Sequence, residues 1–271
     1  PYTAWHTVWG GLVPDLNVGE AAAAIEDFFR KEHIDKGVSG YKIDETDGYD
    51  HWLWPDVATF PSGLSAEQTR QTYGVQWQKL TVDLFREKNV RTYSLTRATN
   101  AGAVSLPFVI YNDYYSHEDF ITALCNSGFT GLLWTPEVRS SDSGEEWLRR
   151  MQSVCFSPMA LLNAWASGTK PWSYSGVEDQ VKDIALLRMR LMPYFYTAFA
   201  RYHFEGIPPF RAMQLEPGFP TRARMEMRTA SLTENPYPEP YLREIKDQYM
   251  AGEFLLVAPM FAGQTSREVI L

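Results

Sequence analysis

The 271-residue sequence contains only two cysteines, Cys125 and Cys155, both in apolar segments that predict helices. They provide neither a disulfide framework nor the spacing of a metal site, so we interpret both as core residues. No apolar run reaches the roughly 18 to 20 residues that a membrane-spanning helix needs. The sequence therefore predicts neither a disulfide-stabilised scaffold nor a membrane-spanning protein.

Basic residues are also in the minority: 25 Lys and Arg stand against 33 Asp and Glu, which gives a formal net charge of −8. Because nucleic-acid binding depends on basic patches, this balance excludes a nucleic-acid partner. No glycine-rich strand-to-helix loop is present, which argues against a nucleotide-binding α/β fold.

The N-terminus has neither the basic nor the apolar segment of a signal peptide. The chain starts without Met, and its last residues, 267–271, have the pattern of an unfinished strand. We therefore expect an excerpt of a longer protein. A secreted, a periplasmic and a cytoplasmic location all stay open, as does an oligomer.

Aromatic residues are abundant, at 14% of the chain, with 9 Trp and 15 Tyr. Aromatic rings are common where sugars stack, and equally common in large cores and interfaces, so composition alone does not distinguish these explanations.

Apolar runs and helical patterns alternate along the chain, which favours a parallel sheet with crossover helices. A helix over 65–88 begins with the N-cap signature of Ser65 and Gln68. Five strands are too few to close an eight-stranded barrel, so we expect the remaining strands before residue 1. After the proline-rich stretch 233–240, the run 253–261 indicates a separate β-domain. The predicted strands are 37–44, 91–97, 106–113, 130–136 and 208–213, and the helices are 18–33, 65–88, 116–126, 145–154 and 177–204.

Two aspartates, Asp44 and Asp113, each follow a short run of apolar, β-branched and aromatic residues. In a barrel, the C-terminal ends of the strands face the side where the chemistry takes place. Two carboxylates about 5 Å apart are what retaining cleavage of a glycosidic bond requires. The pair therefore predicts a glycosidase.

Several segments resemble glycoside hydrolase family 31, the retaining α-glycosidases. The matching segments, in family order, are Tyr41-Lys42-Ile43-Asp44, Leu95-Thr96-Arg97-Ala98-Thr99-Asn100-Ala101-Gly102, Asn112-Asp113, Gly128 through Glu137, Leu191-Met192-Pro193-Tyr194-Phe195-Tyr196, Gly206-Ile207-Pro208 and Leu255-Leu256-Val257-Ala258-Pro259.

The resemblance implies an α/β fold in which residues 1–232 form the second half of a (β/α)8 TIM barrel. Residues 233–271 would then be a linker and the first strands of a β-sandwich. It also implies that Asp44 is the nucleophile, that Asp113 is the general acid/base, and that catalysis uses no cofactor. The substrate partner would be an oligosaccharide or other glycoside.

We predict eight substrate-binding residues: Lys42, Asp47, Trp52, Arg97, Tyr111, Trp134, Glu137 and Asn163. Arg97 has a fork of donors suited to sugar hydroxyls, although it could instead pair with Asp44. Trp134 could stack on a sugar or belong to the barrel core, and Glu137 could instead form an ion pair with Arg139. His51 and His117, with neighbouring acidic residues, lack the spacing of a metal site, so no metal is expected.

The sequence also departs from the family pattern at positions that hold the sugar. Ile110 replaces Trp, Glu137 replaces Asp, Asp47 replaces Glu, and Leu161 and Asn163 replace Arg and His. A pocket rejects sugars whose hydroxyls it cannot bind, so these changes argue against an ordinary α-glucosidase and favour a galacto or N-acetylgalactosamino substrate. A transglycosylase with the same residues stays open, as does a non-catalytic carbohydrate-binding relative.

Overall fold

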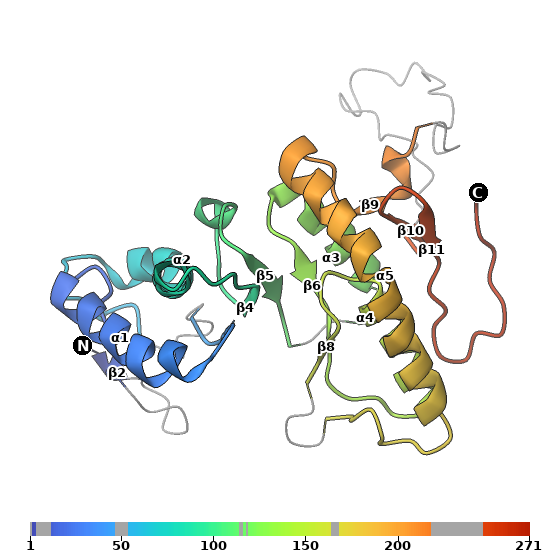
Figure 1. Cartoon of the computed structure of the whole chain (residues 1–271), viewed down its shortest axis with the longest axis horizontal. Coiled ribbons are helices and arrows are strands. Elements are labelled where there is room, and N and C mark those ends of the chain that lie inside the picture. Colours follow the sequence, from blue (N-terminus) through green and yellow to red (C-terminus); the bar gives the residue numbers. More distant parts are fainter. Residues whose placement is uncertain are drawn as a thin grey trace, which may run out of the picture. The chain divides into compact units, whose positions relative to one another are not determined.

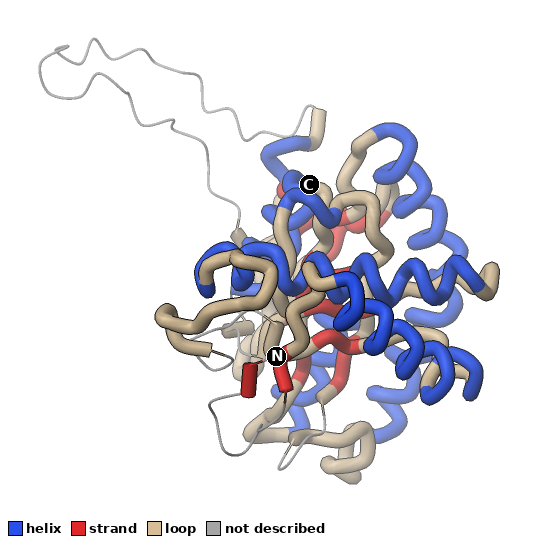
Figure 2. The backbone as a smooth tube through the Cα atoms, turned by 90° about the vertical axis from the view of Figure 1, so that its left-hand side faces the viewer, coloured by secondary structure: helices blue, strands red, loops and turns tan. Residues whose placement is uncertain are grey.

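The computed structural model contains two compact units, Pro1–Asn112 with Thr130–Thr135 and Asp113–Phe129 with Pro136–Leu271, which we describe one at a time. Helices and strands alternate along the chain (Figures 1 and 2), as the predicted α/β fold requires. The structure describes residues 2–3, 12–46, 54–113, 116–117, 119–163, 168–217 and 246–271.

A four-stranded parallel sheet is the centre of the first unit. Its strand order, β3-β4-β5-β6, follows the order along the chain. The strands predicted over 37–44, 91–97, 106–113 and 130–136 are therefore confirmed, although each is shorter than its apolar run. The elements of this unit are β1 (Tyr2–Thr3), β2 (Leu12–Val13), α1 (Gly19–Glu32), η1 (Ile34–Lys36), β3 (Lys42–Ile43), α2 (Ala66–Glu87), β4 (Ser94–Thr96), η3 (Ala101–Ala103), β5 (Phe108–Tyr111) and β6 (Trp134–Thr135).

Helix α2 packs against this sheet and begins with the predicted capping box, in which the Ser65 hydroxyl accepts from the Gln68 amide at 3.2 Å. Val82 of the helix joins a buried cluster with Ile43 and Phe108 of the sheet. Helix α2 and the loop after β4 approach each other closely at Gly74, where an added Cβ would lie 2.3 Å from the backbone oxygen of Ala98.

The second unit contains three α-helices and two small sheets among its described residues. Cys125 and Cys155 are buried free thiols, and burial raises the pKa of Cys125 to about 12 and that of Cys155 to about 11. Both are core residues, as predicted. The elements are α3 (Asp119–Ser127), η4 (Gly128–Thr130), which ends in the first unit, β7 (Glu137–Val138), α4 (Gly144–Cys155), β8 (Leu161–Leu162), α5 (Glu178–Glu205), β9 (Phe210–Ala212), η5 (Met213–Leu215), β10 (Tyr249–Ala251) and β11 (Leu255–Val257).

A strand, β9, forms within the segment predicted over 208–213, but the prediction that it is a fifth parallel strand is wrong. Strand β9 pairs antiparallel with β10, which pairs antiparallel with β11. A tight turn at Gly252, with φ of +64°, joins β10 to β11 and leaves the other edge of β10 for β9. An apolar run predicts a strand but not its partner, so the sequence pattern missed this arrangement.

The unfinished strand predicted at 267–271 is also wrong, because residues 258–271 form no strand in the structure. In this segment, hydrogen bonds from side chains to the backbone take the place of backbone pairing between strands. The Gln248 side chain bonds both the N–H and the C=O of Ile270, and Arg267 donates to the carbonyl of Pro259 at 2.7 Å.

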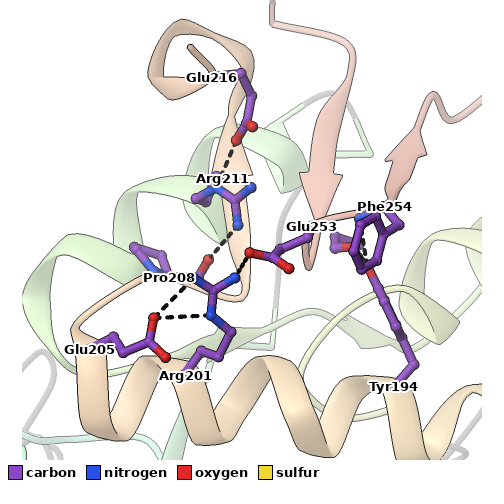
Figure 3. Close-up of polar contacts among 9 residues, drawn as sticks. Tyr194, Arg201, Glu205, Pro208, Arg211, Glu216, Glu253 and Phe254 are labelled. Carbon is purple, nitrogen blue, oxygen red and sulfur yellow. Dashed lines mark hydrogen bonds and ion pairs between the residues drawn. The ribbon is translucent and has the colours of Figure 1, made fainter.

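The β10–β11 turn is tied to α5 by polar contacts (Figure 3). The Tyr194 hydroxyl donates to the carbonyl of Ala251 at 2.7 Å and accepts from the amide of Phe254 at 2.9 Å. Arg201 of the same helix pairs with Glu253 of the turn. These contacts fix the hairpin on the C-terminal half of α5.

Helix α5, with 28 residues, contains Pro193 and is capped by Gly206, whose φ of +73° is the left-handed conformation that terminates many helices. Among the helices that the structure describes, neither α5 nor any other is both long and apolar enough to cross a membrane.

Candidate active site

Asp44 directly follows strand β3 and is surrounded by hydrogen-bond donors. Its Oδ1 accepts from the backbone amide of Glu45 at 2.9 Å and from the guanidinium of Arg97 at 3.2 Å. Arg97 also lies 3.4 Å from the Glu45 carboxylate. Glu45 has φ of +57°, a left-handed backbone conformation that is energetically unfavourable for any residue with a Cβ atom. The chain therefore holds a strained turn immediately after this carboxylate.

The register of the sheet explains why these groups meet. Ile43 pairs with Thr96, and Thr96 with Ile110, so the next residues of the three strands, Asp44, Arg97 and Tyr111, lie abreast on the opposite face. The Arg97 amide donates to the carbonyl of Ile43 at 3.0 Å, which extends the ladder to this position. Three strands thus bring a carboxylate, a guanidinium and a phenol together.

The surroundings of Asp44 favour its ionised form. Burial raises the pKa of Asp44, but the neighbouring Tyr111 phenol, the hydrogen bonds from the Glu45 amide and Arg97, and the positive charge of Arg97 outweigh burial and lower the pKa below the ordinary value of 3.8. At neutral pH this side chain is a carboxylate, the form that a nucleophile needs.

Lys42 and Tyr111 contact each other close to the Asp44 carboxylate. The Lys42 ammonium lies 4.4 Å from the centre of the Tyr111 ring, within the range of a cation–π contact. Tyr111 is only 1% exposed, so its ring is fixed by packing. Four predicted site residues, Lys42, Asp44, Arg97 and Tyr111, are therefore neighbours in the first unit.

Trp134 is buried, with 8% of its surface exposed, and its indole N–H donates to Asn112 Oδ1 at 2.6 Å. It pairs with Ile110 in the sheet, on the face opposite to Tyr111. This placement matches the core alternative for Trp134, and its stacking on a sugar stays a prediction.

Arg97 also lines a pocket of about 360 Å³ in the first unit. Arg70 and Gln71 of α2 and Thr99 of the loop after β4 form other parts of its wall. The close approach of Gly74 to the loop after β4 supports the backbone that carries Arg97.

In the second unit, Asp113 and Glu137 share an arginine. Arg139 lies 3.9 Å from the carboxylate of each. Glu137 is 1% exposed, and its Oε1 accepts from the Asn163 amide at 2.5 Å. Asn163 reaches Glu137 because β7 and β8 are parallel neighbours, with Glu137 opposite Leu161. The structure thus brings Asp113 and Glu137 to one guanidinium, with Asn163 hydrogen-bonded to Glu137.

Sequence reasoning missed the parallel pair β7–β8 and the role of Arg188. This buried arginine of α5 donates to the carbonyls of Ser157 and Pro158 at 2.6 and 2.9 Å. It thereby fixes the chain that leads into β8 and Asn163. A lone arginine in a long helix gives no sequence signal for such a contact.

Two predicted substrate-binding residues, Asp47 and Trp52, lie outside the described residues, as does His51. Among the residues that are described, no group of three or more His, Cys, Asp or Glu side chains could hold a metal ion.

The comparisons with known proteins agree on one family. The family model described as the glycosyl hydrolases family 31 TIM-barrel domain matches residues 2–198. Alpha-glucosidase 2 of Bacillus thermoamyloliquefaciens is 27% identical over 191 residues, which cover 66% of this chain and 22% of that protein. An alpha-glucosidase of Schizosaccharomyces pombe is 29% identical over 122 residues, covering 44% and 11%. This chain thus spans a minor part of the length of these relatives.

Solved structures share the fold. The cycloalternan-degrading enzyme from Trueperella pyogenes superposes with a TM-score of 0.72 at 20% identity, over 97% of this chain and 38% of that one. A family 31 sulfoquinovosidase from E. rectale, in complex with the aza-sugar inhibitor IFGSQ, gives 0.66 at 19% identity, over 94% and 38%. At these identities the likeness concerns the fold alone.

Proposed function

This chain belongs to glycosyl hydrolase family 31, and on that premise we propose that it carries the catalytic residues of a retaining α-glycosidase. The reaction is a double displacement in which a carboxylate attacks the anomeric carbon and water later releases the sugar. The observation that carries the proposal is the environment of Asp44, where an amide, a guanidinium and a phenol all favour the ionised carboxylate.

Asp44 is the proposed nucleophile. Its carboxylate forms a bond to the anomeric carbon while the bond to the leaving oxygen breaks, which gives a covalent glycosyl-aspartate. Arg97 holds the carboxylate at 3.2 Å and is proposed to bind sugar hydroxyls with its remaining donors.

Asp113 is the proposed general acid/base. It protonates the leaving oxygen in the first step and removes a proton from the attacking water in the second. The nearby Arg139, at 3.9 Å, and the Glu137–Asn163 pair form its surroundings in the second unit. Asp47, Trp52 and Trp134 remain proposed sugar contacts.

For the domains, we propose that residues 1–232 are the second half of a (β/α)8 barrel and that 233–271 begin a β-sandwich. The parallel order β3-β4-β5-β6 supports the first part, and the antiparallel β10–β11 hairpin supports the second. Strand β9 joins the hairpin across this boundary, so the sandwich is proposed to start against the end of the barrel.

The sugar in the pocket is proposed to have the galacto or N-acetylgalactosamino configuration. The Glu137–Asn163 hydrogen bond supports this, because the two residues replace the family's Asp and His and already satisfy part of each other's bonding capacity. The related alpha-glucosidases make a gluco substrate the first competitor. A transglycosylase would use the same residues and differ in the acceptor.

Mechanism-based labelling tests the function. The full-length protein is incubated with 2-deoxy-2-fluoro and 5-fluoro α-glycosyl fluorides in gluco, galacto and xylo forms, and adducts are located by peptide mass spectrometry. We expect an adduct on Asp44, and the sugar that labels identifies the pocket. Asp35→Asn, an exposed aspartate paired with Lys88, is the matched control and should label normally.

Absence of an adduct with every reagent, on protein shown to be folded, would contradict the proposal for these sugars. Binding of glycosides without turnover, undiminished by Asp44→Asn, would instead establish the carbohydrate-binding alternative.

A further inference from the structure

Glu45 adopts a backbone conformation that its residue type disfavours. Among the residues that the structure describes, only Glu45 and Asn89 combine a side chain with a positive φ, at +57° and +53°. Asn89 lies just after α2, and asparagine is one of the few residues that enter this conformation routinely. Glutamate has no such preference, so contacts around the turn after Asp44 must hold it in place.

Two contacts connect Glu45 to the proposed nucleophile. Its backbone amide donates to Asp44 Oδ1 at 2.9 Å, and its Oε1 accepts from Arg97 Nη1 at 3.4 Å. The same Nη1 atom donates to the same Oδ1 of Asp44 at 3.2 Å. Glu45 therefore reaches one carboxylate oxygen by two routes, directly through its backbone and indirectly through the guanidinium.

The exposure of the three side chains agrees with a supporting role for Glu45. The Asp44 side chain is 40% exposed, against 28% for Glu45 and 20% for Arg97. The nucleophile is thus the most accessible of the three groups. A guanidinium directs a carboxylate only when its own plane is held, and the Glu45 carboxylate gives it a second point of attachment.

We propose that Glu45 is a positioning residue for Asp44: its carboxylate fixes the Arg97 guanidinium and, by the same bond, holds the left-handed turn that directs its amide to the nucleophile. This inference rests on the proposed function and adds to it a residue that acts through Arg97 and through its own backbone. The sugar is not required to touch Glu45 in this role.

The charge of Glu45 has an effect opposite to that of Arg97. A negative charge beside Asp44 disfavours the ionised form of Asp44, so removal of the Glu45 charge should lower the pKa of Asp44 further. The other charged and titratable groups described around this site remain in place when Glu45 is changed. They are Lys42 of β3, Arg97 after β4, Tyr111 of β5, and Arg70 of α2 with its partner Asp56, while Asp47 lies outside the described residues.

The test measures steady-state kinetics of Glu45→Gln as a function of pH in the full-length protein, using the 4-nitrophenyl α-glycoside of the sugar that labels Asp44. Glutamine keeps the length of the side chain and removes its charge. We expect kcat to fall about tenfold through lost orientation, with KM within about twofold of the original value. The acidic limb of kcat/KM should move downward by about half a pH unit.

Glu45→Gly separates positioning from backbone strain. Glycine enters the left-handed conformation without a steric penalty, so this variant keeps the turn but lacks the carboxylate. We expect its kcat to fall about tenfold as well, with the acidic limb again moved downward. Glu87→Gln is the matched control, because Glu87 is an exposed glutamate that accepts from Arg30 at 2.9 and 3.1 Å. Its kinetics and pH profile should equal those of the unmodified protein.

A purely structural role for Glu45 would let Glu45→Gly recover the kcat and the acidic limb of the unmodified protein. Direct binding of the sugar by Glu45 would raise KM at unchanged kcat. Either result overturns the inference, as does an acidic limb that stays in place or moves upward in both variants. If Glu45→Gln does not fold, Glu45→Gly alone decides.

Asp44→Asn distinguishes this inference from the proposed function. If Asp44→Asn is inactive and the Glu45 variants match the unmodified protein, only the role of Glu45 is wrong. If Asp44→Asn keeps its activity, the proposed function fails, and the inference fails with it.

Discussion

In each of the two units an arginine lies between an aspartate and a neighbouring glutamate, but the distances differ. Arg97 reaches Asp44 at 3.2 Å and Glu45 at 3.4 Å. Arg139 lies 3.9 Å from Asp113 and equally far from a second carboxylate. Only the first set includes a hydrogen bond from the arginine to the aspartate.

The difference follows the two proposed roles. A nucleophile must be ionised before each turnover, and the close donors around Asp44 lower its pKa. An acid/base must take up and release a proton within every cycle, which a rigid set of donors would oppose. The same residue types, Asp and Arg, would therefore serve the two proposed roles through the different distances between them.

The strongest way to break this comparison is Asp44→Asn. An amide cannot form the glycosyl-aspartate, so kcat should fall on the order of 10³-fold or more on every substrate. Steady-state assays with an aryl glycoside and a glycosyl fluoride would measure the loss. Activity that survives on either substrate would remove Asp44 from the nucleophile role.

Asp113→Asn should have a smaller and substrate-dependent effect. General acid/base catalysis contributes about 10²- to 10⁴-fold, and fluoride departs without a proton. Glycosides with poor leaving groups should therefore be slow, while a glycosyl fluoride still forms the covalent adduct. Mass spectrometry of the intact protein should show this adduct accumulating, because water attack now lacks its base. Equal losses on fluoride and on glycoside would contradict the assignment.

Removing each arginine compares the two carboxylates directly. In Arg97→Met, Asp44 loses a hydrogen-bond donor and a neighbouring positive charge, so its pKa should rise. The acidic limb of kcat/KM should therefore move upward by about one pH unit. Arg139→Met should leave that limb in place. The direction of the shift follows from the lowered pKa of Asp44. The ionised carboxylate stabilises the fold above the pKa of the unfolded state, and this contribution is lost as the pH falls through the pKa of the folded state. A shift in the Arg139 variant alone would reverse the comparison.

The sequence predicted the parallel sheet well because its signals are local. Apolar runs marked the strands, Ser65 and Gln68 marked the start of α2, and the family motifs put Asp44 and Arg97 at strand ends. These two residues meet because the parallel register is regular, so the first half of the site followed from pattern and motif.

The rest depended on packing that no pattern encodes. Strands β7 and β8 have two residues each, too few to show a period of two, so the approach of Asn163 to Glu137 was not predictable. The burial of Trp134 and the position of Lys42 over Tyr111 likewise depend on which face of the sheet each residue occupies. A one-residue change of register would exchange those faces.

Substitutions at two glycines test whether the backbone that carries Arg97 affects catalysis separately from the overall stability of the protein. An added Cβ at Gly74 would lie 2.3 Å from the backbone oxygen of Ala98, the residue after Arg97, and one at Gly252 would lie 2.3 Å from the Tyr194 hydroxyl. Each substitution by Ala should lower the free energy of unfolding by about 1 to 3 kcal/mol, measured by chemical denaturation.

Only Gly74→Ala should also change catalysis, because displacement of the Ala98 backbone moves the guanidinium of Arg97 away from Asp44. We expect its kcat to fall severalfold at a temperature where both variants are folded, with the acidic limb shifted in the direction of Arg97→Met. Gly252→Ala, whose added methyl meets the side chain of Tyr194 in the second unit, should keep the original pH profile. Equal kinetic losses in the two variants would mean that the position of Arg97 does not depend on its contact with α2.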